Sequence, residues 1–131
     1  MKYYSKRNLI ALKMTINYNE LSKKVLDFDP KVRFAGVTNS KGELVAGGQK
    51  ENIEKILDDE NLKMSIHYAL KKRDLYTNLA YKIGKEQSSI TEYEKVTLIS
   101  IPINSNDLFM VSTEPRADYL KIIDFIHHSI H

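Results

Sequence analysis

Residues 29–48, DPKVRFAGVTNSKGELVAGG, carry the pattern from which the fold can be worked out. Val32 to Thr38 is short and rich in residues that favour strands, and Glu43 to Ala46 resumes that pattern. The turn signal from Asn39 to Gly42 lies between them, and Gly42 can adopt a positive φ angle. Two strands joined by so short a loop predict a β-hairpin, and we expect Gly47-Gly48 to end the second strand.

A helix is expected on the amino-terminal side of this hairpin. Asn17 and Glu20 have the spacing of a capping box, and apolar residues then recur at helical intervals. These apolar residues are Tyr18, Leu21, Val25 and Phe28. Pro30 should end the helix, because a proline disfavours helical geometry at the residue before it.

On the carboxyl-terminal side, a long helix is predicted first. It runs from about Ile53 to Ile83, could break near Asp58-Asp59, and is terminated by Gly84. Three strands are expected next: Ser88 to Tyr93, Val96 to Ile103 and Asp107 to Thr113. Pro102 cannot donate a hydrogen bond to a neighbouring strand, so it should lie at a strand end or on an unpaired side.

A last helix closes the chain, and we place Pro115 in its first turn. Its apolar stripe is formed by Tyr119, Ile122, Ile123, Ile126 and Ile130. The predicted order is therefore α-β-β-α-β-β-β-α. The loops joining the last three strands are too short for crossover connections, so these strands must pair antiparallel. The sequence predicts an α+β fold, a five-stranded antiparallel sheet with helices on both faces.

The long helix carries two apolar faces. One consists of Leu62, Ile66, Ala69, Leu70, Tyr76, Ala80 and Ile83. The other, which we call the second stripe, consists of Met64, Tyr68, Leu75 and Leu79. A helix that lies on a sheet needs only one apolar face, so either another helix of the chain or a second subunit must cover the second stripe. We favour a second subunit in a twofold dimer, because soluble monomers avoid large exposed apolar patches.

The strand from Ser88 to Tyr93 supports this interpretation weakly. It is short and polar, which is typical of a strand at the edge of a sheet. Such an edge beside the long helix could pair with its symmetry mate and extend the sheet across a dimer. The alternative is a protected edge that pairs with nothing.

With this order of elements, and most clearly in residues 29–48, the sequence resembles the Roadblock/dynein-light-chain domain of the profilin-like folds, over about residues 17–130. It also resembles an uncharacterised archaeal family that shares this segment and is similar from Tyr93 to Pro102. The Roadblock resemblance implies a homodimer and a role as scaffold or regulator, often of small Ras-like GTPases. By position, it implies the dimer residues Met64, Tyr68, Leu75, Leu79, Ile90 and Tyr93. It brings no catalytic motif.

Charge and composition divide the chain unevenly. Its 131 residues suit one domain, and the absence of cysteine excludes disulfides, thiolate zinc sites and cysteine nucleophiles. The net charge of +3 comes from residues 1–13, which contain four basic residues and no acid. We expect this segment to be a disordered arm or a start-site extension before Met14, with a targeting or polyanion-binding arm as the alternative. Residues 14–131 then form the domain.

Sites for chemistry are sparse. Gly47 to Lys50 does not have the spacing of a phosphate loop, and His67 and Asp74 lie too far apart on one helix to act as an acid–base pair. The run from Asp58 to Glu60 suits a helix amino terminus, and His127 with His131 lacks a third metal ligand. We therefore expect no enzyme activity, no cofactor and no metal. Lys71-Lys72-Arg73 could touch phosphates, but no nucleic-acid-binding signature accompanies it.

These observations lead to one main hypothesis and two alternatives. The main hypothesis is a non-catalytic homodimeric interaction module, a scaffold or regulator acting with a small Ras-like GTPase or a signalling complex. The first alternative is a small-ligand sensor of the PAS or GAF type, which needs an internal pocket. The second is a nucleic-acid partner that binds through residues 1–13. No apolar run approaches about 20 residues, so we expect no membrane contact and a cytoplasmic location.

Overall fold

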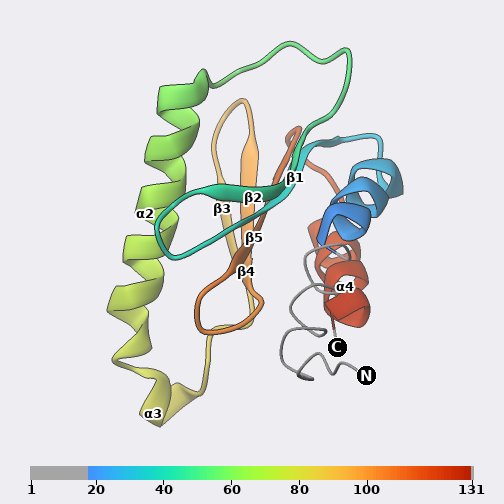
Figure 1. Cartoon of the computed structure of the whole chain (residues 1–131). Helices are drawn as coiled ribbons and strands as arrows, with labels where there is room; N and C mark the ends of the chain where they lie inside the picture. Colours follow the sequence, from blue (N-terminus) through green and yellow to red (C-terminus); the bar gives the residue numbers. More distant parts are fainter. Residues whose placement is uncertain (1–17, 131) are drawn as a thin grey trace, which may run out of the picture.

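The computed structural model of the chain describes residues 18–130, which form a sheet with helices on both faces (Figure 1). A first helix covers residues 18–28. It is followed by β1 (Val32–Thr38), β2 (Leu44–Gln49), α2 (Asp59–Thr77), α3 (Ala80–Ile83), β3 (Ser89–Glu92), β4 (Thr97–Pro102), β5 (Leu108–Thr113) and α4 (Tyr119–Ile130). The predicted α+β fold and order of elements are confirmed, with the predicted long helix divided into α2 and α3. Asn17 and the basic arm, residues 1–13, lie outside the described residues.

The five strands form one antiparallel sheet in the order β2-β1-β5-β4-β3. β1 and β5 lie near the centre, because the last strand of the chain returns to pair with the first. β2 and β3 are the two edges of the sheet. The hairpin of β1 and β2 therefore lies at one edge, and the hairpin of β3 and β4 at the other.

The helices cover the sheet unequally. Figure 1 shows α2 on one face and the first helix with α4 on the other. The face beneath α4 holds the larger core, which includes Val25, Phe109 and Ile126, all with no exposed surface. The face beneath α2 holds a smaller core of Phe34, Ile66, Leu108 and Met110. One face of the sheet is thus covered by a single helix, whereas the opposite face is covered by two.

The turn between β1 and β2 forms as predicted. The side-chain oxygen of Asn39 accepts hydrogen bonds from the backbone of Lys41 at 2.9 Å and of Glu43 at 3.0 Å. Gly42 has a φ of 81°, a conformation that favours glycine because it has no Cβ. The asparagine side chain therefore supports a turn that two backbone hydrogen bonds also close, from Asn39 N–H to Glu43 and from Gly42 N–H to Asn39, each at 3.0 Å.

The expectation that Gly47-Gly48 ends the second strand is wrong. β2 continues to Gln49, and Gly36 pairs with Gly47 across the hairpin. Gly47 has a φ of 83°, and a Cβ built on it would lie 2.2 Å from the carbonyl oxygen of Ala35. Glycine lets the two strands approach closely here, so the pair continues the strand instead of breaking it.

Two predicted helix starts are also wrong. Residues 53–58 are not helical, and α2 begins at Asp59 because the side chain of Asp58 caps it, accepting a hydrogen bond from the backbone of Asn61 at 2.8 Å. α4 begins at Tyr119, and Pro115 lies in the turn before it. Pro102 is the last residue of β4, and Gly84 ends α3 with a φ of 85°, both as predicted.

Candidate functional site

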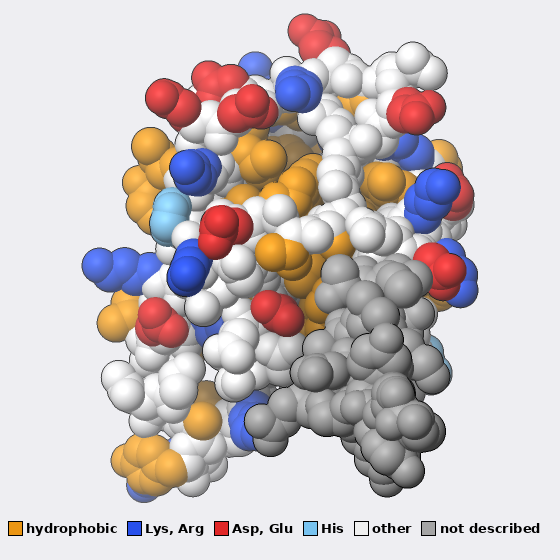
Figure 2. Space-filling view, viewed as in Figure 1, with side chains coloured by type: hydrophobic (Ala, Val, Ile, Leu, Met, Phe, Trp, Pro, Cys, Tyr) orange, Lys and Arg blue, Asp and Glu red, His pale blue; other side chains and the backbone are white. Residues whose placement is uncertain are grey.

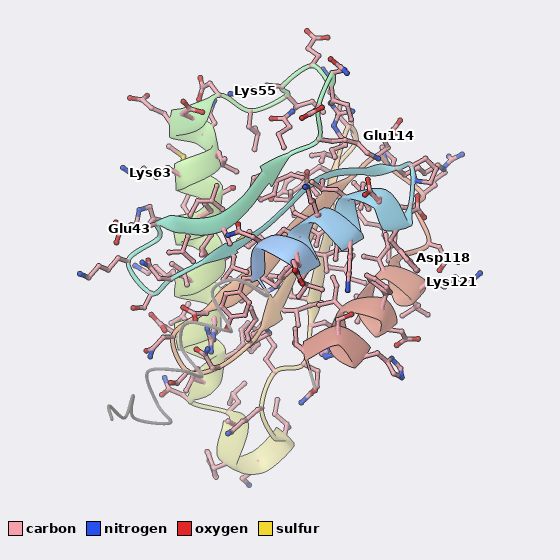
Figure 3. All side chains as sticks on the ribbon, turned by 45° about the vertical axis from the view of Figure 1, so that its right-hand side comes forward. Glu43, Lys55, Lys63, Glu114, Asp118 and Lys121 are labelled. Carbon is pink, nitrogen blue, oxygen red and sulfur yellow. The ribbon has the colours of Figure 1, made fainter. Side chains whose placement is uncertain are left out.

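The second stripe lies on the surface of α2 and continues to Leu79, directly after the end of the helix. Tyr68 is 67% exposed and Leu75 is 62% exposed, and Met64 and Leu79 are also exposed. By contrast, Ile66 on the sheet-facing side of the same helix is only 3% exposed. Within residues 18–130, therefore, no helix of the chain covers the second stripe. Figure 3 shows Lys63 on the outer side of α2, pointing away from the sheet.

The sheet-facing side of α2 is shorter than the sequence pattern suggested. Leu62, Ala69 and Leu70 pack with Ile66 onto the core, as predicted. Tyr76 and Ile83 were expected on this buried face, but both are exposed. The helix is interrupted at Asn78 and Leu79, so the angular pattern is not continued from α2 into α3. The end of α2 and the whole of α3 extend past the packed core.

The free edge of the sheet lies beside α2. Among residues 18–130, β3 pairs only with β4, and the backbone N–H of Tyr93 donates to the carbonyl of Val96 at 2.9 Å. In an antiparallel pair, every second residue forms backbone hydrogen bonds with the neighbouring strand. Counting back from Tyr93, Thr91 also forms backbone hydrogen bonds with β4, whereas the backbone groups of Ile90 and Glu92 point away from β4. The outer edge of β3 therefore presents backbone donors and acceptors at Ile90 and Glu92.

An open groove of about 310 Å³ joins this edge to α2. Its lining includes Ser65, Tyr68, Lys72, Ser89, Tyr93 and Leu98. The ammonium group of Lys72 spans it, donating to the hydroxyl of Ser89 at 2.8 Å. The structure thus brings Tyr68 of the second stripe and Tyr93 of the β3–β4 hairpin to one surface. We call the second stripe, this groove and the free edge of β3 the interaction surface.

Ile90 occupies a different position from the other predicted dimer residues. It pairs with Ile99, whose side chain is fully buried in the core beneath α4. Directly opposed residues in an antiparallel pair place their side chains on the same face, so the side chain of Ile90 lies on the face away from α2. Its contribution to a contact along the edge would come from its backbone.

Two side chains of the basic run Lys71-Lys72-Arg73 on α2 form hydrogen bonds within the chain. The guanidinium group of Arg73 donates to the backbone carbonyls of Asn104 and Asp107 in the β4–β5 turn, the second at 3.3 Å. Lys72 is bound to Ser89. Two of the three side chains in the run Lys71-Lys72-Arg73 thus attach α2 to the sheet. The sequence analysis missed both roles, because their partners are distant in the sequence.

The β4–β5 turn also contacts the first helix, on the face of the sheet opposite α2. The side-chain amide of Asn104 donates to the hydroxyl of Tyr18 in the first helix at 3.5 Å. Burial raises the pKa of Tyr18 and the nearby negative charge of Asp107 raises it further, while the hydrogen bond from Asn104 acts in the opposite direction. The turn therefore connects the helices on both faces of the sheet.

The acidic run at the start of α2 has a structural role. Asp58 caps the helix, and Asp59 forms an exposed ion pair of 3.7 Å with Lys55. Among residues 18–130, no group of three or more histidine, aspartate or glutamate side chains is arranged to hold a metal ion. His131, one member of the predicted histidine pair, lies outside the described residues.

A second and smaller space lies between α2 and the sheet, near the loop before α2. A cavity of about 60 Å³ lies under the loop before α2, and its apolar lining includes Phe34, Ile56, Leu62, Ile66, Val96 and Leu98. Pockets for small-molecule ligands usually measure about 300 Å³ or more. This cavity is therefore too small for a PAS- or GAF-like ligand, whereas the groove beside β3, at about 310 Å³, reaches that size. In the described part of the chain, no helix combines the length and the apolar character needed to cross a membrane.

A family model described as "Family of unknown function (DUF6659)" matches residues 11–129. Comparison of the sequence with curated proteins finds no match.

Solved structures are similar over most of the chain. The gliding protein MglB from Thermus thermophilus has a TM-score of 0.73 at 14% identity, covering 89% of this chain and 85% of that chain. An MglB structure described as having a tetrameric arrangement has a TM-score of 0.71 at 16% identity, covering 88% and 85%. A Roadblock/LC7 domain from Streptomyces avermitilis has a TM-score of 0.66 at 13% identity, covering 86% and 90%. The predicted Roadblock-like fold is confirmed.

Proposed function

The chain belongs to the DUF6659 family, and we propose that it is a non-catalytic homodimeric interaction module with a Roadblock-type fold. The observation that carries this proposal is the exposed second stripe of α2 beside the free edge of β3. Burial of large apolar side chains is the main favourable term in most protein association. A contiguous apolar surface of this kind marks a place where another protein binds.

The spacing of the second stripe supports a second copy of the same chain as the partner. Its positions are 64, 68, 75 and 79, with intervals of four, seven and four residues. This pattern is the same when read in reverse. An antiparallel copy of α2 therefore places Tyr68 opposite Leu75, with a twofold axis between residues 71 and 72. Met64 then lies opposite Leu79, which follows directly after the end of α2. Such self-complementarity is what a twofold interface requires.

The free edge of β3 supplies the second part of the contact. A twofold axis beside α2 also relates the two β3 strands, and two copies of one strand related in this way run antiparallel. The outward backbone groups of Ile90 and Glu92 are then available for hydrogen bonds between subunits. The two sheets would join into one, and backbone pairing would determine the register of the apolar contact.

The role of this dimer is to hold or regulate another protein, and a small Ras-like GTPase is the partner that the Roadblock resemblance implies. The tetrameric arrangement described for one MglB is consistent with self-association of this fold in a related architecture. Lys72 and Arg73 form hydrogen bonds within the chain, to Ser89 and to the β4–β5 turn. Because these side chains have a structural role, a protein partner is favoured over a phosphate-rich one.

Light scattering on the full chain at micromolar concentration tests the proposal. We expect a mass of twice 15.2 kDa for the natural sequence and of one chain for the double variant Tyr68→Glu, Leu75→Glu. Both side chains are exposed, so the variant should keep its helical content and its melting transition as a monomer. Leu120→Glu is the matched control, because Leu120 is an exposed leucine on α4, away from the interaction surface. A monomeric natural chain would contradict the proposal.

A further inference from the structure

We propose that in this dimer the α3 segment of each subunit docks on the loop before α2 of the other subunit, with Ile83 inserted into the cavity beneath that loop and Tyr81 against its rim. This inference rests on the proposed homodimer. It assigns a role to Tyr81 and Ile83, which we call the tip, and to the cavity lined by Ile56 and Leu62, which we call the cap cavity. Each cap cavity would thus be completed by the partner's tip.

The tip is the most exposed apolar feature of the described chain. Tyr81 is 83% exposed and Ile83 is 74% exposed, more than any other large apolar side chain in residues 18–130. The segment is nevertheless ordered by its own backbone, since Ile83 donates to the carbonyl of Leu79 at 3.1 Å and Gly84 donates to Ala80 at 2.8 Å. Ordered apolar side chains that project into water indicate a contact that a single chain does not make.

The cap cavity offers an apolar site of matching size. Its volume of about 60 Å³ has room for roughly four to six water-sized groups, and an isoleucine side chain has four carbon atoms. The loop above it is held by Arg33, whose guanidinium group donates to the carbonyl of Glu54 at 2.6 Å. Ile56 is partly exposed at this site, and Figure 2 shows hydrophobic side chains recessed near this loop.

The cap cavity is continuous with the interaction surface. Ser65, Leu98 and Met110 line both the cavity and the groove beside β3. A partner that occupies the groove therefore reaches the cavity without any rearrangement of the sheet. The cavity is thus part of the surface that the dimer would cover.

A tip cannot reach the cap cavity of its own chain. Figure 1 shows α3 at one end of α2 and the loop before α2 at the other. α2 contains 19 residues, which corresponds to a length of about 28 Å. In the antiparallel pairing given by the second stripe, however, the end of α2 from which α3 continues lies beside the amino-terminal end of the partner subunit's α2. Leu62 lines the cap cavity, so each tip arrives at the partner's cavity.

The charges around the two sites are complementary. Lys82 and Lys85 flank the tip, whereas Asp59 and Glu60 form the exposed first turn of α2 beside the cavity. Antiparallel pairing brings these opposite charges together at both ends of the interface. Parallel pairing would instead place acids beside acids and lysines beside lysines, so charge favours the arrangement that docks the tip.

Disulfide cross-linking of the full chain provides the test, since the natural sequence contains no cysteine. We would mix the single variants Ile56→Cys and Ile83→Cys under mild oxidation. We expect a cross-linked dimer to form at least tenfold faster in the mixture than with either variant alone. The length of α2 places both sites too far apart for a bond within one chain. Peptide mass spectrometry identifies the linked residues.

A second pair separates this inference from the homodimer itself. Mixing Tyr68→Cys with Leu75→Cys reports the antiparallel contact of the two α2 helices. Cross-linking of this pair without cross-linking of Ile56→Cys to Ile83→Cys would overturn the docking of the tip and leave the dimer in place. Failure of both pairs, with a monomeric natural chain, would overturn both proposals. As an independent readout, Ile83→Ser should raise the dimer Kd at least tenfold, whereas Leu120→Ser should leave it unchanged.

Discussion

The ammonium group of Lys72 in α2 donates a hydrogen bond of 2.8 Å to the hydroxyl of Ser89 in β3. This contact joins the two parts of the interaction surface, because the helix carries the second stripe and the strand carries the free backbone edge. A dimer that uses both parts requires them to keep a constant distance. Lys72 therefore orders the surface before a partner arrives, which reduces the entropic cost of association.

Removal of this contact should weaken the dimer more than it destabilises the chain. Within one chain, an exposed hydrogen bond of this kind contributes at most about 1 kcal/mol to stability, so Lys72→Ala should lower the melting temperature of the monomer by no more than about 2–4 °C. Because the variant also loses the fixed distance between α2 and β3, its dimer Kd should rise severalfold, as measured by sedimentation equilibrium. Lys63→Ala is the matched control, since Lys63 points away from the sheet (Figure 3) and should leave the Kd unchanged.

The free edge of β3 can be blocked without disturbing the sheet. Ile90→Pro removes an N–H that points away from β4, so the monomer should remain folded while the dimer dissociates in light scattering. Thr91→Pro removes an N–H that bonds to β4 and should lower the stability of the monomer in a urea titration. If both variants had the same effect on stability, the assignment of the outward groups would be wrong.

Arg73 should stabilise the fold through the β4–β5 turn. Its guanidinium group is partly buried and donates to two backbone carbonyls, which Arg73→Ala would leave without this partner. We expect a loss of about 1–3 kcal/mol in the free energy of unfolding. Arg73→Lys should not restore it, because lysine lacks the fork of donors that reaches both carbonyls. Lys71→Ala on the exposed side of the helix serves as the control.

Gly47 and Gly48 should respond differently to alanine. Gly47 has a φ of 83°, and a Cβ there would lie 2.2 Å from the carbonyl oxygen of Ala35, so Gly47→Ala should destabilise the chain. The left-handed conformation alone costs about 1–2 kcal/mol, and the clash adds to it. Gly48→Ala meets no atom within 4 Å and should have little effect on the urea midpoint.

Tyr18 should make stability depend on alkaline pH. Burial and the charge of Asp107 raise its pKa in the folded chain above the ordinary value of 10.0. The unfolded chain therefore loses this proton first, so the stabilisation is complete below the ordinary value and declines as the pH rises through the folded pKa. Tyr18→Phe should have a smaller decline in unfolding free energy between pH 9 and pH 11, approximate limits chosen around the ordinary tyrosine pKa. Tyr76→Phe, at an exposed position outside the interaction surface and the tip, should behave as the natural chain.

Features with local causes could be predicted from the sequence. The β1–β2 turn depends on Asn39 and Gly42 alone, which are close together in the chain, and it formed as expected. The apolar period of α4 placed Ile122 and Ile126 in the core. Local spacing gave a wrong helix start before Asp58. Ile53 to Leu57 have apolar residues at helical spacing, but this segment is not helical, and α2 begins only after Asp58, whose side chain caps it.

In the candidate site, too, features that depend on nearby residues could be predicted, whereas contacts between distant residues could not. The second stripe was predicted because Met64, Tyr68 and Leu75 share one helix, where angular position follows from the sequence, and Leu79 comes directly after it. The contact of Lys72 with Ser89 spans 17 residues and that of Arg73 with Asp107 spans 34, so neither leaves a local signal. The same holds for the tip, since the interruption at Asn78 decides which way Tyr81 and Ile83 project.

The sequence by itself determined the order of elements, the antiparallel pairing of the last three strands and the presence of two apolar faces on α2. These depend on the periods of helix and strand and on loop length. Only the tertiary structure decided that one face stays exposed within residues 18–130, that β3 lies at the sheet edge beside it, and that a cavity lies at the opposite end of α2 from the tip. The physical reason is that burial depends on which surfaces meet in space, whereas periodicity specifies only which residues share a face.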